Sequence, residues 1–306
     1  MRIGRTAGLT DTGRRRLRNE DAYVCRPPLF AVADGMGGAR AGEVAARLAA
    51  AALEEAEGAA RGEEGVSRLI AEANRRIWQR AVSDPATAGM GTTATAAVVD
   101  EQAGTVAIGH VGDSRAYLLR DGALEQLTTD HSLVAELVQS GVLTPEEAER
   151  HPQRSAITRA LGTEPTVQVE SLTVRAEPGD LFLLCSDGLS TMLGDDEVAA
   201  AIERAGGEPA SAAEALVAQA NSRGGEDNIT VVLFELVEGE PEAEPDPAGP
   251  TPGEDEPSEP TEQASAHAAG DVRTHGAGSG GRLLSLGLIV ALLVVAVLAL
   301  YWGISR

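Results

Sequence analysis

Cysteine is scarce in this chain of 306 residues, and lysine is missing from it altogether. The two cysteines, Cys25 and Cys185, lie far apart, and Cys185 falls within the apolar run 181–185. No CxxC pair is present, so the sequence gives no support to a zinc or redox site. We expect two reduced thiols in a reducing compartment, with Cys185 buried as a small hydrophobic residue.

Aromatic residues are also few, at 3% of the chain, whereas hydrophobic residues as a whole make up 43%. Leucine, valine, isoleucine and alanine must therefore fill most of any core. Positive charge is in short supply too, since the formal net charge is −22. Because nucleic acids are bound by basic surfaces, this balance argues against a nucleic-acid partner.

The composition changes sharply after Leu236. Residues 237–281 are rich in Pro, Glu, Ala and Gly and lack apolar periodicity, which predicts a disordered acidic linker. Residues 282–306 contain an uncharged apolar run at 283–303, long enough to span a bilayer as one transmembrane helix. A buried core helix is the alternative, and it is disfavoured because the run follows a disordered linker. We expect a folded domain over 1–236 and a membrane anchor at the end.

The first residues lack the apolar stretch of a secretory signal, so we expect the folded domain to remain in the cytoplasm. The protein would then be a single-pass protein of the cell membrane. Arg273 and Arg282, on the linker side of the apolar run, agree with this orientation, while Arg306 on the far side counts against it.

Short apolar or alternating runs predict β-strands in the folded domain, at 29–33, 92–99, 105–111, 116–119, 124–127, 167–174, 181–185 and 229–236. Helical periodicity predicts two pairs of helices, at 42–57 with 63–82 and at 195–204 with 210–222. Antiparallel strands interrupted by helix pairs favour an α+β fold over βαβ alternation.

Short acidic motifs, most of them beside glycine, recur at 19–21, 34–38, 112–114, 186–188 and 226–228. Most of them follow or adjoin an apolar run, which would place each carboxylate at the end of a strand, facing a cleft. One such aspartate usually marks a turn. Several together repel one another unless a cation neutralises them. The pattern predicts a pocket for hard divalent cations, which prefer carboxylate, carbonyl and water oxygens.

The motif at 34–38 also invites a dinucleotide-binding interpretation, because it lies between a predicted strand and a predicted helix. Arg40 stands where the last glycine of the GxGxxG pattern belongs, and Asp34 would place negative charge where a pyrophosphate binds. A metal site fits better, since Asp34 can bridge cations and Gly35 can offer its carbonyl.

The motifs match, in order, those of the metal-dependent protein phosphatases of type 2C, and the chain resembles the bacterial branch of that family. The matching segments cover nearly all of 1–236 and lie at 16–21, 33–38, 91–93, 110–115, 151–154, 184–189 and 227–230. The resemblance implies a central antiparallel β-sandwich flanked by helix pairs, in α-β-β-α layers. This agrees with the predicted strands and helices.

The resemblance also implies roles for individual residues. Asp34 would bridge two Mn²⁺ or Mg²⁺ ions, and the Gly35 carbonyl would bind the second. Asp187 and Asp227 would complete the shell of the first ion. Arg16 would hold the substrate phosphate.

Other acidic residues would lie further out. Glu20 and Asp21 would act mainly through bound waters, and Asp113 would bind a third, weaker metal. The segment 130–162 resembles the family's flap beside the active site, where Arg154 and Ser155 are candidates for contact with substrate or the third metal.

The implied activity is hydrolysis of phosphoserine and phosphothreonine in proteins, by direct attack of a hydroxide that bridges the two ions. The implied partners are phosphorylated proteins, including a Ser/Thr protein kinase whose signalling the enzyme would reverse. Two alternatives differ in class. A non-catalytic scaffold would be favoured by loss of a ligand aspartate, and none is lost. A structural Ca²⁺ site would need an EF-hand-type loop, and none is present.

Met36 departs from the pattern of other family branches, which carry at this position a histidine proposed to protonate the leaving group. Methionine cannot donate a proton, so a metal-bound water, near Asp113 for example, would have to supply it. His110 and His131 are candidates only through their proximity in sequence. His110 lies within a predicted strand, which favours a packed structural role. Substrate, physiological metal, linker role and oligomeric state stay open.

Overall fold

Antiparallel sheets form the centre of the computed structural model, which describes residues 1–37, 41–55 and 61–239. One sheet has the order β1 (Arg2–Asp11), β12 (Ile229–Val237), β11 (Leu181–Cys185), β8 (Arg115–Arg120), β9 (Ala123–Gln126). The other has the order β10 (Glu170–Arg175), β7 (Thr105–Val111), β6 (Ala94–Asp100), β3 (Leu29–Ala33), β2 (Ala22–Arg26). A small third sheet pairs β4 (Gly35–Met36) with β5 (Gly91–Thr92).

The two large sheets pack face to face around a core of mostly aliphatic side chains. The chain has only three phenylalanines, and all three meet at the centre of this core. Phe234 stacks on Phe30 with ring centroids 4.1 Å apart. It also stacks on Phe182, with centroids 5.0 Å apart. The three phenylalanines thus pack against one another between the two sheets.

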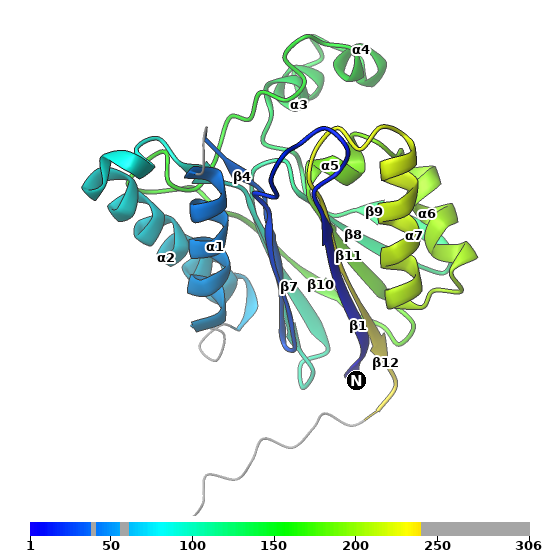
Figure 1. The fold of residues 1–306 in the computed structure, drawn as a ribbon. Helices are drawn as coiled ribbons and strands as arrows, with labels where there is room; N and C mark the ends of the chain where they lie inside the picture. The colour runs from blue at the N-terminus through cyan, green and yellow to red at the C-terminus, as the bar shows by residue number, and fades with distance from the viewer. Residues whose placement is uncertain (38–40, 56–60, 240–306) are drawn as a thin grey trace, which may run out of the picture. The chain divides into compact units, whose positions relative to one another are not determined.

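Helix pairs cover the outer faces of the sandwich (Figure 1). The pair α1 (Ala41–Glu55) and α2 (Gly62–Ser83) lies on the sheet that contains β7, and a 3₁₀ turn (Pro85–Thr87) follows it. The pair α6 (Asp195–Arg204) and α7 (Pro209–Ser222) lies on the sheet that contains β12. The α-β-β-α layers predicted from the sequence are confirmed for the described residues.

Strand boundaries differ from the predictions in a few places. β1 and β2 were not predicted, because β1 contains glycines and polar residues and has no fully buried position. Its pairing with β12 stabilises it instead, together with the hydrogen-bonded ion pair in which Arg5 Nη2 lies 2.8 Å from Glu235 Oε2. The predicted strand 92–99 divides into β5 and β6, and the predicted strand 167–174 is observed as β10.

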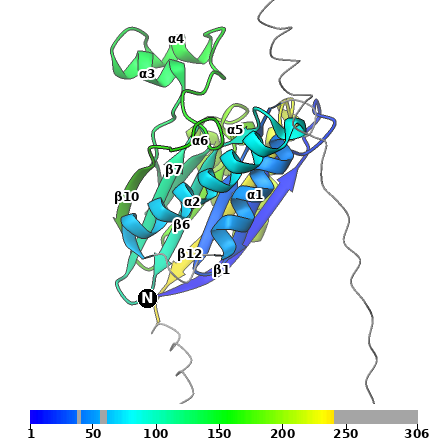
Figure 2. The same ribbon diagram turned by 90° about the vertical axis from the view of Figure 1, so that its left-hand side faces the viewer.

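The flap predicted at 130–162 contains α3 (Leu133–Gln139) and α4 (Pro145–Glu149). Ser132 caps α3 through its side chain, and Thr144 caps α4 with a capping box. Figure 2 shows the flap extending beyond the ends of the strands. A bridge between Ser132 and Ile157 closes its base. No residue of α3 is buried, so this helix contributes little to the core.

The predicted linker from residue 240 onward and the predicted transmembrane helix lie outside the described residues. Within the described ranges, no helix has the length and apolar character needed to cross a bilayer.

Candidate active site

Acidic residues gather at one end of the sandwich because the strands that flank them all end or begin there. Asp34 follows β3, Asp113 follows β7, and Asp187 opens the short helix α5 (Asp187–Ser190) after β11. Asp21 precedes β2 and Asp227 precedes β12. In Figure 1 this is the end that carries β4 and α5, below the flap. The strands thus bring together carboxylates that are scattered along the sequence.

The pKa values show how closely the carboxyl groups interact. Burial, and then the charges of Asp21, Asp187, Asp113 and Asp227, raise the pKa of Asp34 well above its usual 3.8. Burial and the neighbouring Asp227 raise the pKa of Asp187 to about 6. Burial raises the pKa of Asp21 and that of Asp113 each to about 7. Asp34 interacts electrostatically with the other four carboxyl groups and is therefore central to the cluster.

Two threonines hold the Asp34 backbone in place. The Asp34 amide donates to Thr93 Oγ1 at 2.9 Å, and the Thr93 amide donates to the Asp34 carbonyl at 2.9 Å. Thr92 Oγ1 donates to the same carbonyl at 2.8 Å. Because its backbone groups are all engaged, the carboxyl of Asp34 is the group left for the cluster.

Gly35 sits where no larger residue fits. A Cβ atom there would lie 2.3 Å from the Gly42 carbonyl oxygen and 2.4 Å from the Glu20 carbonyl oxygen. A Cβ on Gly42 would in turn lie 2.3 Å from Glu20 Oε2, so the Glu20 carboxylate packs against the start of α1. The structure therefore brings Glu20 and Gly35 together beside the acidic cluster.

The acidic cluster has buried carboxylate oxygens without hydrogen-bond partners, and such oxygens suit a divalent cation. Asp21 Oδ2 accepts hydrogen bonds from Ser186 Oγ at 2.9 Å and from Thr230 Oγ1 at 2.6 Å. Asp21 Oδ1 and Asp187 Oδ1, by contrast, are shielded from solvent and have no hydrogen-bond partner. Buried carboxylate oxygens without partners are costly, and cations are the groups that satisfy several of them at once.

Among the described residues, no three Asp, Glu, His or Cys side chains form a ready-made metal centre. One of the carboxylates is instead paired with Arg16, whose Nη2 lies 2.5 Å from Asp227 Oδ2. The guanidinium thus pairs with a carboxylate to which the family resemblance gives a metal-binding role. The carboxyl groups nevertheless influence one another's pKa values. The ligand roles of Asp21, Asp34, Gly35, Asp113, Asp187 and Asp227 stay predictions.

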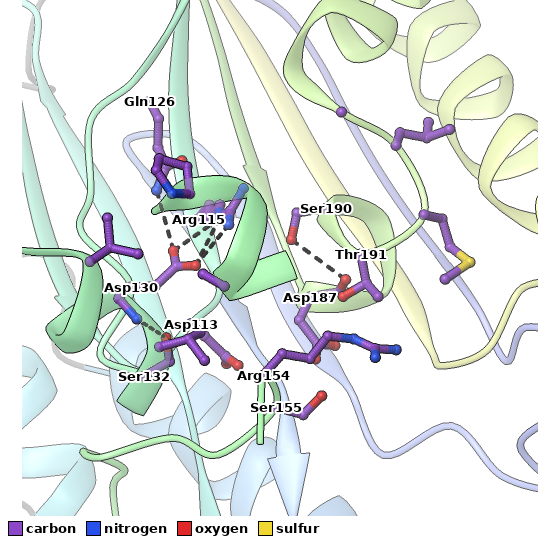
Figure 3. A pocket seen from close by; sticks show the side chains of 18 of the residues that line it. Asp113, Arg115, Gln126, Asp130, Ser132, Arg154, Ser155, Asp187, Ser190 and Thr191 are labelled. Atoms are coloured by element: carbon purple, nitrogen blue, oxygen red, sulfur yellow. Dashed lines mark hydrogen bonds and ion pairs between the residues drawn. The ribbon is translucent and has the colours of Figure 1, made fainter. Parts of the chain in front are cut away.

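A hollow of about 1060 Å³ extends from Asp113 and Asp187 to the underside of the flap. Arg154 and Ser155 line it, so the flap residues singled out from the sequence do face the acidic cluster (Figure 3). Val138 of α3 and Met192 after α5 contribute apolar side chains to the lining. The acidic cluster and the flap therefore line the same hollow.

Sequence reasoning missed the role of Asn228. Its Nδ2 donates to the carbonyls of Thr12 at 3.0 Å and Arg18 at 2.8 Å, and its Oδ1 accepts from the Glu20 amide at 2.8 Å. Asn228 therefore ties the β1–β2 loop, which carries Arg16, to the segment before β12. The motif 226–228 drew attention to this position, but nothing local indicates contacts with residues more than 200 positions away.

The two histidines near Asp113 are structural. His110 is fully buried in β7, with Nδ1 2.9 Å from Thr95 Oγ1, and burial followed by the nearby His131 lowers its pKa to about 4. His131 Nδ1 accepts from the Gly112 amide at 3.1 Å. Neither ring lines the hollow. A neutral, enclosed imidazole is a poor proton donor to a leaving group.

Comparison with known proteins agrees with this geometry. The protein phosphatase 2C family model matches residues 13–219. The chain belongs to the protein phosphatase 2C family. It is 41% identical to the serine/threonine phosphatase stp of Listeria innocua, over 74% of this chain and 93% of that protein.

The serine/threonine protein phosphatase PstP of Mycobacterium tuberculosis is 42% identical, over 82% of this phosphatase 2C chain and 49% of PstP. A crystal structure of the catalytic domain of PstP in complex with two manganese ions superposes with a TM-score of 0.71 and 38% identity. The match covers 77% of this chain and 99% of that structure.

Proposed function

We propose that this phosphatase 2C chain is a metal-dependent protein serine/threonine phosphatase, which hydrolyses phosphoserine and phosphothreonine in proteins. It uses two Mn²⁺ or Mg²⁺ ions, with a third, weaker site at Asp113. The observation that carries the proposal is the meeting of five carboxyl groups and Arg16 at one end of the sandwich. PstP, which has the same fold, binds two manganese ions.

The acidic residues would hold the ions. Asp34 would be shared by both ions, as the resemblance implies, and its electrostatic interaction with the other four carboxyl groups supports this role. Asp187 and Asp227 would bind one ion with it, the Gly35 carbonyl would bind the other, and Asp21 and Glu20 would act through bound water. When bound, two such ions lower the pKa of a water molecule and neutralise charge on the phosphoryl group.

Arg16 would bind the phosphoryl group. Its side chain is 55% exposed, so it can turn from Asp227 to a substrate. A guanidinium binds two phosphoryl oxygens through parallel hydrogen bonds, which orients phosphorus and offsets its charge. Met36 in β4 offers no proton, and His110 and His131 are enclosed. Solvent in the hollow beside Asp113 therefore supplies the proton for the leaving hydroxyl.

The test is release of phosphate from a phosphothreonine peptide by the full chain, with Mn²⁺ and again with excess EDTA. We expect release with Mn²⁺ and none with EDTA, restored by added Mn²⁺. A chain that binds Mn²⁺ in calorimetry but releases no phosphate from any phosphopeptide would instead support a non-catalytic scaffold.

We also propose that the apolar run 283–303 anchors the protein to the cell membrane with the phosphatase domain in the cytoplasm. The support is the uncharged length of the run and the acidic linker that precedes it. A Ser/Thr kinase in the same compartment would be both partner and substrate. Fractionation of cells that express the chain with and without 283–303 tests the anchor, and phosphoproteome comparison with and without the gene tests the partner.

A further inference from the structure

The β1–β2 loop carries more positive charge than the proposed chemistry uses. Arg14, Arg15, Arg16 and Arg18 lie within five consecutive residues, although the chain as a whole has a net charge of −22. Only Arg16 has a role in the proposed reaction. All four side chains are exposed, and Leu17 between them is 99% exposed. Single exposed apolar residues are common, so the argument rests on the arginines.

The backbone of the loop is firmly held. The amides of Arg14 and Arg15 both donate to the Gly225 carbonyl, at 2.7 and 3.2 Å. A Cβ on Gly13 would lie 2.1 Å from the Asp227 carbonyl oxygen, so the loop is packed directly against the segment before β12. The arginine side chains are therefore presented to solvent from a fixed base, which lowers the entropic cost of binding through them.

Arg14 and Arg15 differ from Arg16 in having no acidic partner. Across the described ranges, no ion pair or side-chain hydrogen bond joins either guanidinium to another residue, whereas Arg16 pairs with Asp227. Other exposed arginines of the domain do have acidic partners, as Arg5 has in Glu235 and Arg75 in Glu72. The guanidinium groups of Arg14 and Arg15 extend from a hydrogen-bonded backbone beside Arg16, and both are available to an external anion.

The position of these cations indicates which anion they meet. Successive Cα atoms lie about 3.8 Å apart, so Arg14 and Arg15 stand within two residues of the arginine that would hold the phosphoryl group. An extended substrate advances about 3.3–3.6 Å per residue. Side chains one to three residues from the phosphoresidue are therefore within reach of Arg14 and Arg15.

We propose that Arg14 and Arg15 form a docking site for anionic groups that flank the phosphoresidue of the substrate. The enzyme then prefers protein segments with an acidic residue or a second phosphate next to the phosphoryl group that it removes. The inference rests on the proposed function of the Arg16 site. Guanidinium groups bind carboxylate and phosphate in the same forked geometry, so both kinds of flank can use the docking site.

Peptides of equal length test the docking site, each with one phosphothreonine flanked by alanine, by glutamate or by a second phosphothreonine. The full chain with Mn²⁺ is compared with R14A/R15A. Alanine keeps the two backbone amides that bind Gly225, so the loop stays in place. The matched control is R68A/R175A, which removes two exposed arginines, one from α2 and one from the end of β10. Both double variants lose two positive charges.

We expect the wild-type chain to favour an anionic flank about tenfold in kcat/KM, mostly through KM, because two exposed ion pairs each change binding a few-fold. The preference falls to near one in R14A/R15A, stays in R68A/R175A, and weakens with added salt. The larger of the glutamate and phosphothreonine gains identifies the preferred anion.

An unchanged preference in R14A/R15A overturns the docking site while leaving the phosphatase activity intact. Hydrolysis of p-nitrophenyl phosphate, which has no flanking residues, should be equal in all three proteins, and a loss confined to R14A/R15A overturns the inference too. Absence of hydrolysis of every substrate by the wild-type chain contradicts the proposed function itself.

Discussion

At the scale of single residues, the active site is a compromise between function and stability. Asp34 is surrounded by four other carboxylates, and its own pKa is raised well above 3.8 by burial and by their charges. Asp21 Oδ1 and Asp187 Oδ1 lack hydrogen-bond partners. Groups arranged in this way destabilise the metal-free fold, and the proposed binding of ions would offset that cost.

Replacement of Asp34 by asparagine should therefore separate the two effects. We expect Asp34→Asn to lower phosphatase activity by more than about 100-fold, since the bridging ligand is lost. The melting temperature in EDTA should rise by a few degrees, about 1 kcal/mol, because the metal-free fold no longer has to bury an ionisable carboxyl group beside four others. Asp196→Asn, at an exposed acid of α6, is the control. Full Mn²⁺-dependent activity of Asp34→Asn would contradict the assignment.

The acidic cluster also predicts how stability depends on pH. The pKa values of Asp21 and Asp113 are raised to about 7 and that of Asp187 to about 6, from 3.8. Between pH 3.8 and about pH 7, the metal-free folded state therefore binds more protons than the unfolded state. The resulting stabilisation is complete below pH 3.8 and is lost as pH rises through 6 to 7.

We thus expect the protein in EDTA to melt at a lower temperature at pH 8 than at pH 5.5. Excess Mn²⁺ should restore most of the difference at pH 8, because the ions stabilise the ionised carboxylates. At pH 5.5 protons compete with the metal, and Mn²⁺ should stabilise less. Thermal melts at both pH values, with and without Mn²⁺, measure this. A metal-free melting temperature that rises toward pH 8 would contradict the predicted coupling.

At the scale of elements, the β1–β2 loop depends on one side chain from the segment just before the last strand, β12. Asn228 makes three hydrogen bonds to the backbone of that loop. We expect Asn228→Ala to cost about 2 kcal/mol of stability, because backbone groups are left unpaired. KM for phosphopeptides should also rise, since Arg16 lies on the loosened loop.

A matched control distinguishes these two consequences. Asn74 is equally enclosed in α2, where its Oδ1 accepts from the Gly162 amide at 2.8 Å. Asn74→Ala should destabilise the fold to a similar extent and leave KM for phosphopeptides close to that of the wild type. Equal KM values for the wild type and Asn228→Ala would mean that the loop keeps Arg16 in place without Asn228.

We expect the domain to remain folded when the flap is deleted. The base of the flap is joined by the Leu133 amide, which donates to the Ala156 carbonyl at 2.8 Å, and α3 has no buried residue. Replacing 134–155 with a short glycine linker should leave the melting temperature within a few degrees. Because the flap covers the hollow, kcat/KM should fall more for phosphopeptides than for p-nitrophenyl phosphate. Aggregation or a large loss of melting temperature would show that the flap supports the core.

At the scale of the whole molecule, the first and last strands of the described domain pair with each other. β12 (Ile229–Val237) pairs with both β1 and β11, so the last strand lies inside the sheet. We expect a chain that ends at Gly239 to fold and to hydrolyse phosphopeptides with the kcat/KM of the full chain. Membrane association in cell fractions should be lost at the same time. Loss of folding on truncation would contradict the predicted domain boundary near 236.

Much of this protein is determined by its sequence alone. Short apolar runs such as 181–185 indicate buried strands from their own residues, and the helix pairs follow from their 3.6-residue periodicity. The acidic motifs lie at the ends of those runs, so their gathering and the family could be predicted together.

Only the tertiary structure decided how distant segments meet. Arg16 contacts Asp227, 211 positions away, because β1 lies antiparallel to β12. β1 itself was not predictable, since a half-buried strand with glycines is stabilised by pairing rather than by its own pattern. The same pairing places Asn228 under the arginine loop. Local patterns depend on short-range sterics and burial, whereas these contacts depend on which strands become neighbours once the core has formed.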